Sequence, residues 1–293
     1  MITVKAPAKI NWSLFVLDKR QDGYHNILSL MQCVGLYDVI DFELADTLTL
    51  NSSIELPGDQ NLVFKAASLL KNYSGISMGA RITLSKEIPS GAGLGGGSSD
   101  AAYTLMALNE LWNARLGKDQ LKALGASLGF DVPFFFEGPL ARAEDCGEQL
   151  SRLPVSVDYI LLLVKADCSV PTSWAYGALD SERDAKVAPA YIESEKDNIG
   201  MIYHALASGD FYGLAEIMRN DFENTVMRRY PVIRDVKERL LRSGAVAALM
   251  SGSGSTVFGL FNNEGTAMEA VKHFPSYFCR VVKTLTDQDY GSI

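Results

Sequence analysis

The spacing of hydrophobic and polar positions predicts both strands and helices in the first half of the chain. Three segments rich in β-branched and aromatic residues predict strands separated by polar turns, at Ile10 to Leu17, Ile27 to Leu36 and Val39 to Leu44. The spacing becomes helical from Asn61 to Tyr73, a segment whose first residue is a suitable N-cap. Ala80 to Leu84 alternates again, as a strand does. The first half therefore mixes strands and helices.

The second half has a different order of strand-like and helical segments. The apolar run from Tyr159 to Val164 predicts a buried strand, and the polar stretch from Asp180 to Lys186 predicts an exposed loop. After the first strand come helices, two strands, one helix and a last strand, which is the split βαβ, or ferredoxin-like, order. The helices are expected near 198–207, 211–220, 231–242 and 264–273, and the strands at 245–250, 256–261 and 278–284.

Length and local composition predict two domains. A chain of 293 residues is long for one domain. Pro154 and Ser156 separate the two halves, so we expect an N-terminal domain of residues 1–155 and a C-terminal domain of residues 156–293.

Composition and charge exclude several classes of function. The chain carries 27 Lys and Arg against 35 Asp and Glu, a net charge of −8, which gives no broad basic surface for nucleic acid. No apolar run approaches the ~20 residues that span a bilayer, and we expect no signal peptide because the first residues hold no long apolar stretch. Four cysteines lie far apart, and three histidines lack metal-binding spacing. We therefore expect a soluble, cytoplasmic protein that binds no nucleic acid, no membrane and no structural metal. The sequence leaves open whether it is a monomer or a homodimer.

The most informative segment runs from Pro89 to Ala102, with the sequence PSGAGLGGGSSDAA. Its glycines let backbone N–H groups approach a ligand closely, and Ser98 and Ser99 are placed to cap the amphipathic helix that follows. The helix N-terminus would favour an anion at the same point, most often a phosphate. A flexible hinge without a ligand remains the structural alternative.

Two better-known phosphate motifs do not fit this segment. Gly91, Gly93 and Gly96 match the dinucleotide fingerprint formally, but no buried strand runs directly into the first glycine. The region ~20 positions later has helical spacing, where the fingerprint needs an acidic residue at the end of a strand. A Walker A loop needs Gly-Lys before Ser or Thr, and Gly117-Lys118 is followed by Asp119.

The glycine-rich segment resembles the second motif of the GHMP kinases, a superfamily of small-molecule kinases. Ala6 to Asn11 resembles the first motif, and Met250 to Val257 resembles the third, so the resemblance spans nearly the whole chain. It implies a two-domain α+β GHMP kinase fold, with an N-terminal domain like the second domain of ribosomal protein S5 and a ferredoxin-like C-terminal domain. It also implies ATP, accompanied by Mg²⁺ for which the sequence names no ligand.

Four segments resemble one branch of this superfamily more closely, namely Pro7 to Asn11, Arg20 to His25, Gly129 to Phe134, and Ser169 to Thr172 with Tyr176. That branch phosphorylates the 2-hydroxyl of a cytidine diphosphate-linked methylerythritol in non-mevalonate isoprenoid synthesis. Members commonly have Ala where Phe130 stands, and many have Pro where Ser255 stands. Neither change alters a proposed chemical group. Another GHMP kinase acting on mevalonate, homoserine or a sugar, and a non-catalytic sensor on the same fold, remain alternatives.

The resemblance implies a catalytic pair. Asp131 corresponds to the general base and Lys9 to its partner cation, which would keep the carboxylate ionised and lie near the transferred phosphoryl group. Phe130 and Val132 suggest apolar surroundings for this carboxylate. Taken alone, the pair is equally well explained as a structural salt bridge.

The resemblance also assigns binding residues. Tyr24, His25 and Tyr176 would surround the cytosine ring, although an aromatic-histidine pair in a loop is otherwise more often surface or partial core. Lys86 could reach the nucleotide or be solvated. Thr172 could touch substrate or cap a helix, and Asp59, Asp100 and Glu110 are expected to be surface or capping acids. The expected ATP-binding residues are Lys86, Pro89, Gly91, Gly93, Leu94, Gly95, Gly96, Gly97, Ser98 and Ser99, and the expected substrate-binding residues are Asn11, Tyr24, His25, Thr172, Tyr176, Gly252, Ser253 and Gly254.

Overall fold

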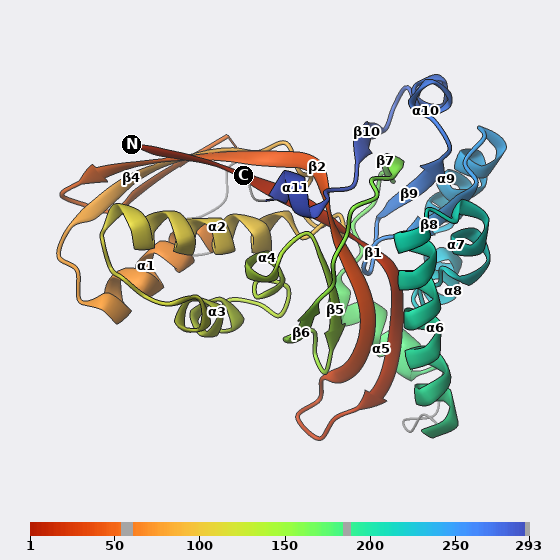
Figure 1. Cartoon of the computed structure of the whole chain (residues 1–293), viewed down its shortest axis with the longest axis horizontal. Helices are drawn as coiled ribbons and strands as arrows, with labels where there is room; N and C mark the ends of the chain where they lie inside the picture. The colour runs from red at the N-terminus through yellow and green to blue at the C-terminus, as the bar shows by residue number, and fades with distance from the viewer. Residues whose placement is uncertain (54–60, 184–188, 291–293) are drawn as a thin grey trace.

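Two long antiparallel strands run through the middle of the molecule and join its two lobes (Figure 1). β1 (Ile2–Lys19) pairs with β2 (His25–Ala45) along almost its whole length, with irregularities after Pro7, Asn11 and Val16 that bend the ribbon. The structure is a computed structural model that describes residues 1–53, 61–183 and 189–290.

The first lobe is a mixed sheet covered by helices. Its six strands follow the order β3-β4-β2-β5-β6, with β1 paired to β2; β3 and β4 are parallel and the other pairs antiparallel. Apolar side chains of this sheet and of α1 and α2 form one core cluster. The further elements are β3 (Thr49–Ser52), β4 (Gly79–Ser85), β5 (Leu140–Glu144), β6 (Gln149–Arg152), α1 (Leu62–Ser74), α2 (Gly96–Leu111), α3 (Lys118–Ala126) and α4 (Phe134–Glu137).

The second lobe is an antiparallel sheet of order β10-β7-β9-β8. Numbered within the lobe, this order is fourth, first, third and second, as a ferredoxin-like sheet requires. Its elements are β7 (Ile160–Lys165), β8 (Ala247–Met250), β9 (Thr256–Phe261), β10 (Phe278–Lys283), α5 (Thr172–Asp180), α6 (Pro189–Ser208), α7 (Phe211–Ile217), α8 (Glu223–Arg229), α9 (Pro231–Arg242) and α10 (Glu264–Val271). The C-terminal α11 (Asp287–Tyr290) returns to the first lobe, where the Tyr290 hydroxyl donates to the Phe135 carbonyl at 2.7 Å.

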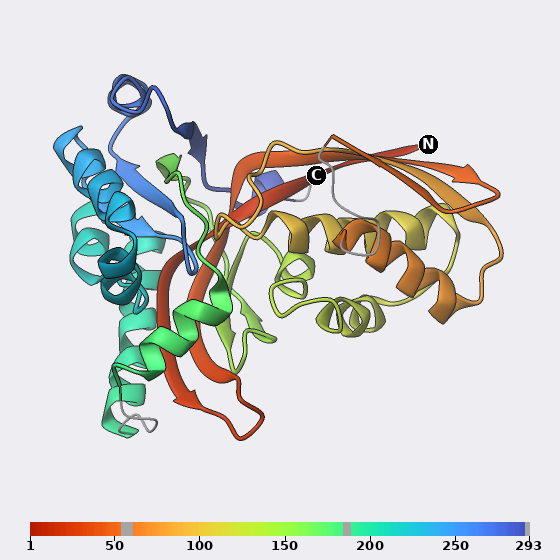
Figure 2. The same ribbon diagram turned by 180° about the vertical axis from the view of Figure 1, so that it is seen from behind.

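The two lobes share a core. Ile10 and Trp12 of β1 and Leu28 of β2 pack in the same cluster as Leu161 and Phe258 of the second sheet, while a third cluster fills the other face of that sheet. Seen from behind, α5 lies beside the β1–β2 hairpin (Figure 2). The boundary placed after residue 155 stays a prediction. No helix in the described part of the chain is long and apolar enough to cross a bilayer.

The pattern-based prediction divides β2 wrongly. The segments Ile27 to Leu36 and Val39 to Leu44 belong to one strand, which continues through Tyr37 and Asp38 paired with Pro7 and Ala6. Asp38 is tolerated at a fully buried strand position because its carboxylate accepts hydrogen bonds from two backbone N–H groups and from a lysine. The helix predicted at 231–242 coincides with α9.

Two further expectations are changed or fall outside the described residues. The polar stretch expected to be a loop from Asp180 begins as the last residue of α5, a helix that the spacing does not predict. α5 buries Ala175 and Leu179 against the second lobe. The rest of that stretch, from residue 184 to Lys186, and Asp59 lie outside the described residues.

Candidate active site

Most predicted site residues line one cavity of about 340 Å³ between the lobes. They come from β1, the glycine loop, the segment before α4, α5 and the turn between β8 and β9. The predicted residues lining it are Lys9, Asn11, Gly91, Gly93, Gly95, Ser98, Asp131, Thr172, Tyr176, Gly252, Ser253 and Gly254. Tyr24 and His25 instead line an adjoining cavity of about 410 Å³, which shares Phe130, Cys146, Thr172 and Tyr176 with the first. Pro89, Leu94, Gly96, Gly97, Ser99 and Lys86 lie outside both linings.

The glycine loop turns through left-handed backbone conformations. Gly91, Gly93 and Gly95 have φ of 61°, 77° and 67°, values that favour glycine strongly. Gly95 is the N-cap of α2, so the prediction that Ser98 and Ser99 cap this helix is wrong. Both serines lie in its first turn instead. Their hydroxyls therefore lie where the helix dipole is positive, with Ser98 at the cavity wall.

The glycine loop is packed directly on the turn between β8 and β9, which carries the third motif. A Cβ on Gly93 would lie 2.1 Å from the backbone oxygen of Ser251, so no larger residue fits there without displacing that turn. The Ser251 hydroxyl donates to the Gly93 carbonyl at 2.9 Å, and the N–H of Thr256 donates to the Ala92 carbonyl at 3.1 Å. The second and third motifs therefore form one backbone cradle.

Lys9 and Asp131 meet at the wall of this cradle. Lys9 Nζ lies 3.4 Å from Asp131 Oδ2, and the lysine side chain is 4% exposed whereas the aspartate is 41% exposed. Asp131 therefore faces the cavity, and the expectation that its carboxylate lies in apolar surroundings is wrong. Lys9 Nζ also donates to Asn11 Oδ1 at 2.8 Å, and the Asn11 amide donates to Ser29 Oγ at 2.8 Å. The cation is held in place from the protein side and meets the carboxylate on the cavity side.

Lys86 lies beneath the glycine loop in a buried cluster with two carboxylates. Its Nζ donates to Asp38 Oδ2 and, at 2.7 Å, to Asp100 Oδ2, which excludes the solvated alternative. Asp100 is 3% exposed, so the prediction of a surface acid is wrong for this residue. Burial raises the pKa of Asp100 to about 7, against the lowering by Lys86. Burial lowers the pKa of Lys86, but the two carboxylates outweigh it and raise that pKa.

The adjoining cavity is aromatic. The His25 ring stacks on Tyr176, with 4.9 Å between ring centroids, and its Nε2 lies 2.6 Å from Asp180 Oδ1. Tyr24 is 53% exposed and meets Phe130 edge to face at 5.0 Å. Burial, followed by the charge of Asp131, raises the pKa of Tyr176 above its usual range, so its hydroxyl stays protonated. Flat apolar faces with polar edges suit a nucleobase.

Thr172 is the first residue of α5 rather than its cap, because Pro171 occupies the N-cap position. Its hydroxyl lies 2.9 Å from that of Ser253, so it joins α5 to the third-motif turn. Sequence reasoning missed Asp180, Phe222 and Asn220, which contact His25, Tyr176 and the third-motif turn respectively. No local sequence pattern marks these three residues, because each contacts a partner distant in the sequence.

The described residues show no cluster of acidic, histidine or cysteine side chains for Mg²⁺. In the described ranges, no three His, Cys, Asp or Glu side chains are grouped so as to hold a metal ion. Asp131, the carboxylate at the main cavity, is already paired with Lys9. The residues present do not make a metal cage.

Comparison with known proteins supplies the family. The model of the GHMP kinase N-terminal domain matches residues 61–139, and that of the GHMP kinase C-terminal domain matches residues 202–278. The chain belongs to the GHMP kinases. This GHMP kinase has the two-domain α+β fold that the sequence predicted, and it is a small-molecule kinase by membership of that family. GHMP kinases use ATP as the phosphate donor.

Several relatives of this GHMP kinase are named as the same enzyme. It is 47% identical over 290 residues to the 4-diphosphocytidyl-2-C-methyl-D-erythritol kinase of Thermodesulfovibrio yellowstonii, with 98% of this chain and 99% of the relative covered. The Clostridioides difficile protein of that name is 39% identical, with 91% and 89% covered. A crystal structure of 4-(cytidine 5'-diphospho)-2C-methyl-D-erythritol kinase has a TM-score of 0.81 at 34% identity, covering 97% and 99%. Homoserine kinase from Cytophaga hutchinsonii has a TM-score of 0.73 at 20% identity, covering 98% and 95%, a likeness of fold alone.

Proposed function

We propose that this GHMP kinase transfers the γ-phosphoryl group of ATP to the 2-hydroxyl of 4-diphosphocytidyl-2-C-methyl-D-erythritol, giving the 2-phosphate and ADP. The reaction would serve non-mevalonate isoprenoid precursor synthesis. The observation that carries the proposal is the junction of two cavities, one with Lys9 and Asp131 against the glycine cradle and one with aromatic walls. Relatives of that name at 47% and 39% identity support it.

Asp131 is the proposed general base. Its carboxylate takes the proton of the 2-hydroxyl as the hydroxyl oxygen bonds to the γ-phosphorus and the bond from that phosphorus to the ADP oxygen breaks. Phosphoryl transfer has a loose transition state, so positioning and charge neutralisation matter more than base strength. The exposure of Asp131 to the cavity leaves room for the hydroxyl. A purely structural salt bridge would have no such need.

Lys9 is the proposed electrostatic partner. Its buried ammonium is fixed by Asn11, so it is preorganised to stabilise charge on the transferred group. Backbone N–H groups of the glycine loop and the first turn of α2 are proposed to hold the ATP phosphates. Mg²⁺ is proposed to be carried mainly by those phosphates, because no three His, Cys, Asp or Glu side chains in the described part of the chain are grouped to hold it.

The aromatic cavity is the proposed cytosine site. Tyr24, Tyr176 and Phe130 offer ring faces and edges to the base, while His25, held by Asp180, offers polar ring atoms. Asn11 lines the main cavity and Thr172 lines both cavities, so the methylerythritol and the diphosphate are proposed to bind beside them.

The product identifies the reaction. We expect ATP and the cytidyl substrate to yield ADP and a new phosphomonoester resonance in ³¹P NMR. Because C2 carries a methyl group and no hydrogen, a phosphate at O2 has no three-bond coupling to a proton, and its resonance stays a singlet. A doublet or triplet would place the phosphate on O3 or O1 and overturn the assigned position, and no new resonance would overturn the function.

A further inference from the structure

Asn220 is hydrogen-bonded to the backbone of the third-motif turn and does not line the cavity. Its side chain is buried, at 3% exposure. Its Nδ2 donates to the carbonyls of Met250 and Gly252, at 2.7 and 2.8 Å, and its Oδ1 accepts from the N–H of Phe222 at 3.0 Å. These partners allow one orientation of the amide, because the opposite orientation would set an oxygen against two carbonyls.

The bond to Gly252 determines where the next N–H points. The peptide bond between Gly252 and Ser253 is trans, so the Gly252 carbonyl and the Ser253 N–H point in opposite directions. Asn220 draws the carbonyl to the rear of the turn and thereby turns the N–H of Ser253 forward. Among the described residues, no group accepts a hydrogen bond from this N–H, while those of Gly252 and Gly254 are satisfied by Asn11 and Ser251. Ser253 itself lines the cavity.

Resting on the proposed function, we propose that Asn220 is a positioning residue that aims the Ser253 N–H at a phosphate oxygen in the cavity. The oxygen belongs either to the ATP phosphates or to the diphosphate of the substrate. An amide N–H aimed in advance at an oxyanion loses no energy to reorganisation when charge develops. Asn220 contributes this aim through two backbone carbonyls and contacts no ligand itself.

The segment that carries Asn220 is anchored to β1. The N–H of Leu14 donates to the Arg219 carbonyl, and the N–H of Asp221 donates to the Leu14 carbonyl, both at 2.9 Å. The buried Asp221 carboxylate also accepts from the N–H of Val16 at 2.9 Å. β1 also carries Lys9, so Asn220 is held in register with the cation of the proposed catalytic pair.

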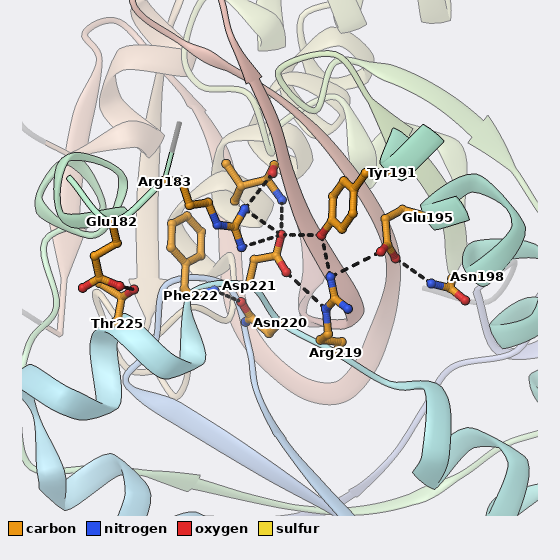
Figure 3. A network of polar contacts seen from close by, with 11 residues as sticks. Glu182, Arg183, Tyr191, Glu195, Asn198, Arg219, Asn220, Asp221, Phe222 and Thr225 are labelled. Carbon is orange, nitrogen blue, oxygen red and sulfur yellow. Dashed lines mark hydrogen bonds and ion pairs between the residues drawn. The ribbon is translucent and has the colours of Figure 1, made fainter. Parts of the chain in front are cut away.

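Asp221 is the centre of a polar network that fixes this segment from outside (Figure 3). It pairs with Arg183 at 3.2 Å and with Arg219 at 3.3 Å, which compensate its buried charge. Arg219 continues to Glu195, whose other carboxylate oxygen accepts from Asn198 at 2.6 Å. Asn198 therefore marks the outer end of the network, away from the third-motif turn.

Two substitutions test the proposal against a control from the same network. Asn220→Asp keeps the shape and the acceptor for Phe222 but removes both donors, and Asn220→Ala removes the side chain. We expect kcat/KM to fall roughly 10- to 100-fold in both, because misplacement by about 1 Å costs up to about 100-fold. Asn198→Ala loses a hydrogen bond of the same network, and its kcat/KM is expected to stay within about twofold of the wild type. Circular dichroism at the assay temperature checks folding.

The kinetic parameters identify the oxygen. A rise in KM for ATP alone assigns the Ser253 N–H to an ATP phosphate, and a rise for the cytidyl substrate alone assigns it to the diphosphate. A fall in kcat with both KM values unchanged assigns it to the phosphoryl group in the transition state. Wild-type kinetics in Asn220→Asp, or equal losses in Asn220→Ala and Asn198→Ala, would overturn the proposal.

The amide resonance of Ser253 in the wild-type protein gives a second measurement that needs no folded variant. We expect its proton to move downfield when a non-hydrolysable ATP analogue or the cytidyl substrate binds, and an unmoved resonance with both would overturn the proposal. If the wild-type enzyme fails to turn over the cytidyl substrate, the proposed function fails separately. The response of Ser253 to the ATP analogue then still tests the aim of this N–H.

Discussion

Gly93→Ala tests the cradle formed by the second and third motifs, and Gly91→Ala is its matched control. Both glycines lie in the same loop with positive φ, 61° for Gly91 and 77° for Gly93. They differ in the space for a methyl group. A Cβ on Gly91 meets its nearest atom, Ser169 Oγ, at an ordinary 3.8 Å, whereas a Cβ on Gly93 lies 2.1 Å from the Ser251 oxygen.

The expected destabilisation follows from these two terms. The left-handed conformation costs an L-residue about 1–2 kcal/mol, and both variants carry this term. Only Gly93→Ala must also displace the Ser251 backbone, and overpacking of this kind adds about 1–3 kcal/mol. The free energy of unfolding should therefore fall by about 1–2 kcal/mol in Gly91→Ala and by about 2–5 kcal/mol in Gly93→Ala.

Equilibrium urea unfolding and steady-state kinetics measure the two consequences. Displacing the third-motif turn by about 1 Å should lower kcat/KM up to about 100-fold in Gly93→Ala. Gly91→Ala should lose less than about 10-fold, because no backbone segment has to move. Equal losses of stability and of activity in the two variants would refute the contact between the glycine loop and the third-motif turn.

Three further substitutions test the general base, the proposed cytosine site and the raised pKa of the buried Asp100. Asp131→Ala should abolish nearly all turnover while circular dichroism shows a retained fold, and an undiminished kcat would remove Asp131 as general base. Tyr176→Ala should raise KM for the cytidyl substrate and leave KM for ATP nearly unchanged. An unchanged KM for the cytidyl substrate would exclude Tyr176 from the cytosine site. Because the pKa of Asp100 rises from 3.8 to about 7 on folding, the folded state holds this proton more tightly, and the stabilisation present below pH 4 is lost as the pH rises through 7. In urea titrations from pH 5 to 8, the free energy of unfolding of the wild type should therefore fall relative to that of Asp100→Asn. Parallel curves of this free energy against pH for the two proteins would contradict the raised pKa.

Local sequence patterns predict those parts of the site that depend on the backbone. The glycines from 91 to 97 and the amphipathic helix after them encode a tight approach and a helix N-terminus within one short segment. The helix from Pro231 to Arg242 is marked at its start by proline and by strong amphipathic spacing. The three motifs could be found in order because each is a compact string of residues.

Buried charges and distant partners cannot be predicted in this way. Asp100 resembles a surface acid in the sequence, and only the fold brings Lys86 and Asp38 to it. Asp180 lies 155 residues from His25, its partner in the aromatic cavity. The amide of Asn220 has no local pattern that points to Gly252. In each case tertiary contacts satisfy a polar group that the local sequence would place in solvent.

The most direct test of the proposed function is ADP release by the wild-type enzyme with ATP and three alcohols side by side. These are 4-diphosphocytidyl-2-C-methyl-D-erythritol, mevalonate and homoserine. We predict sustained ADP release with the cytidyl compound and none above background with the other two. Turnover of mevalonate or homoserine with comparable kcat/KM, or binding of the cytidyl compound without ADP release, would contradict it.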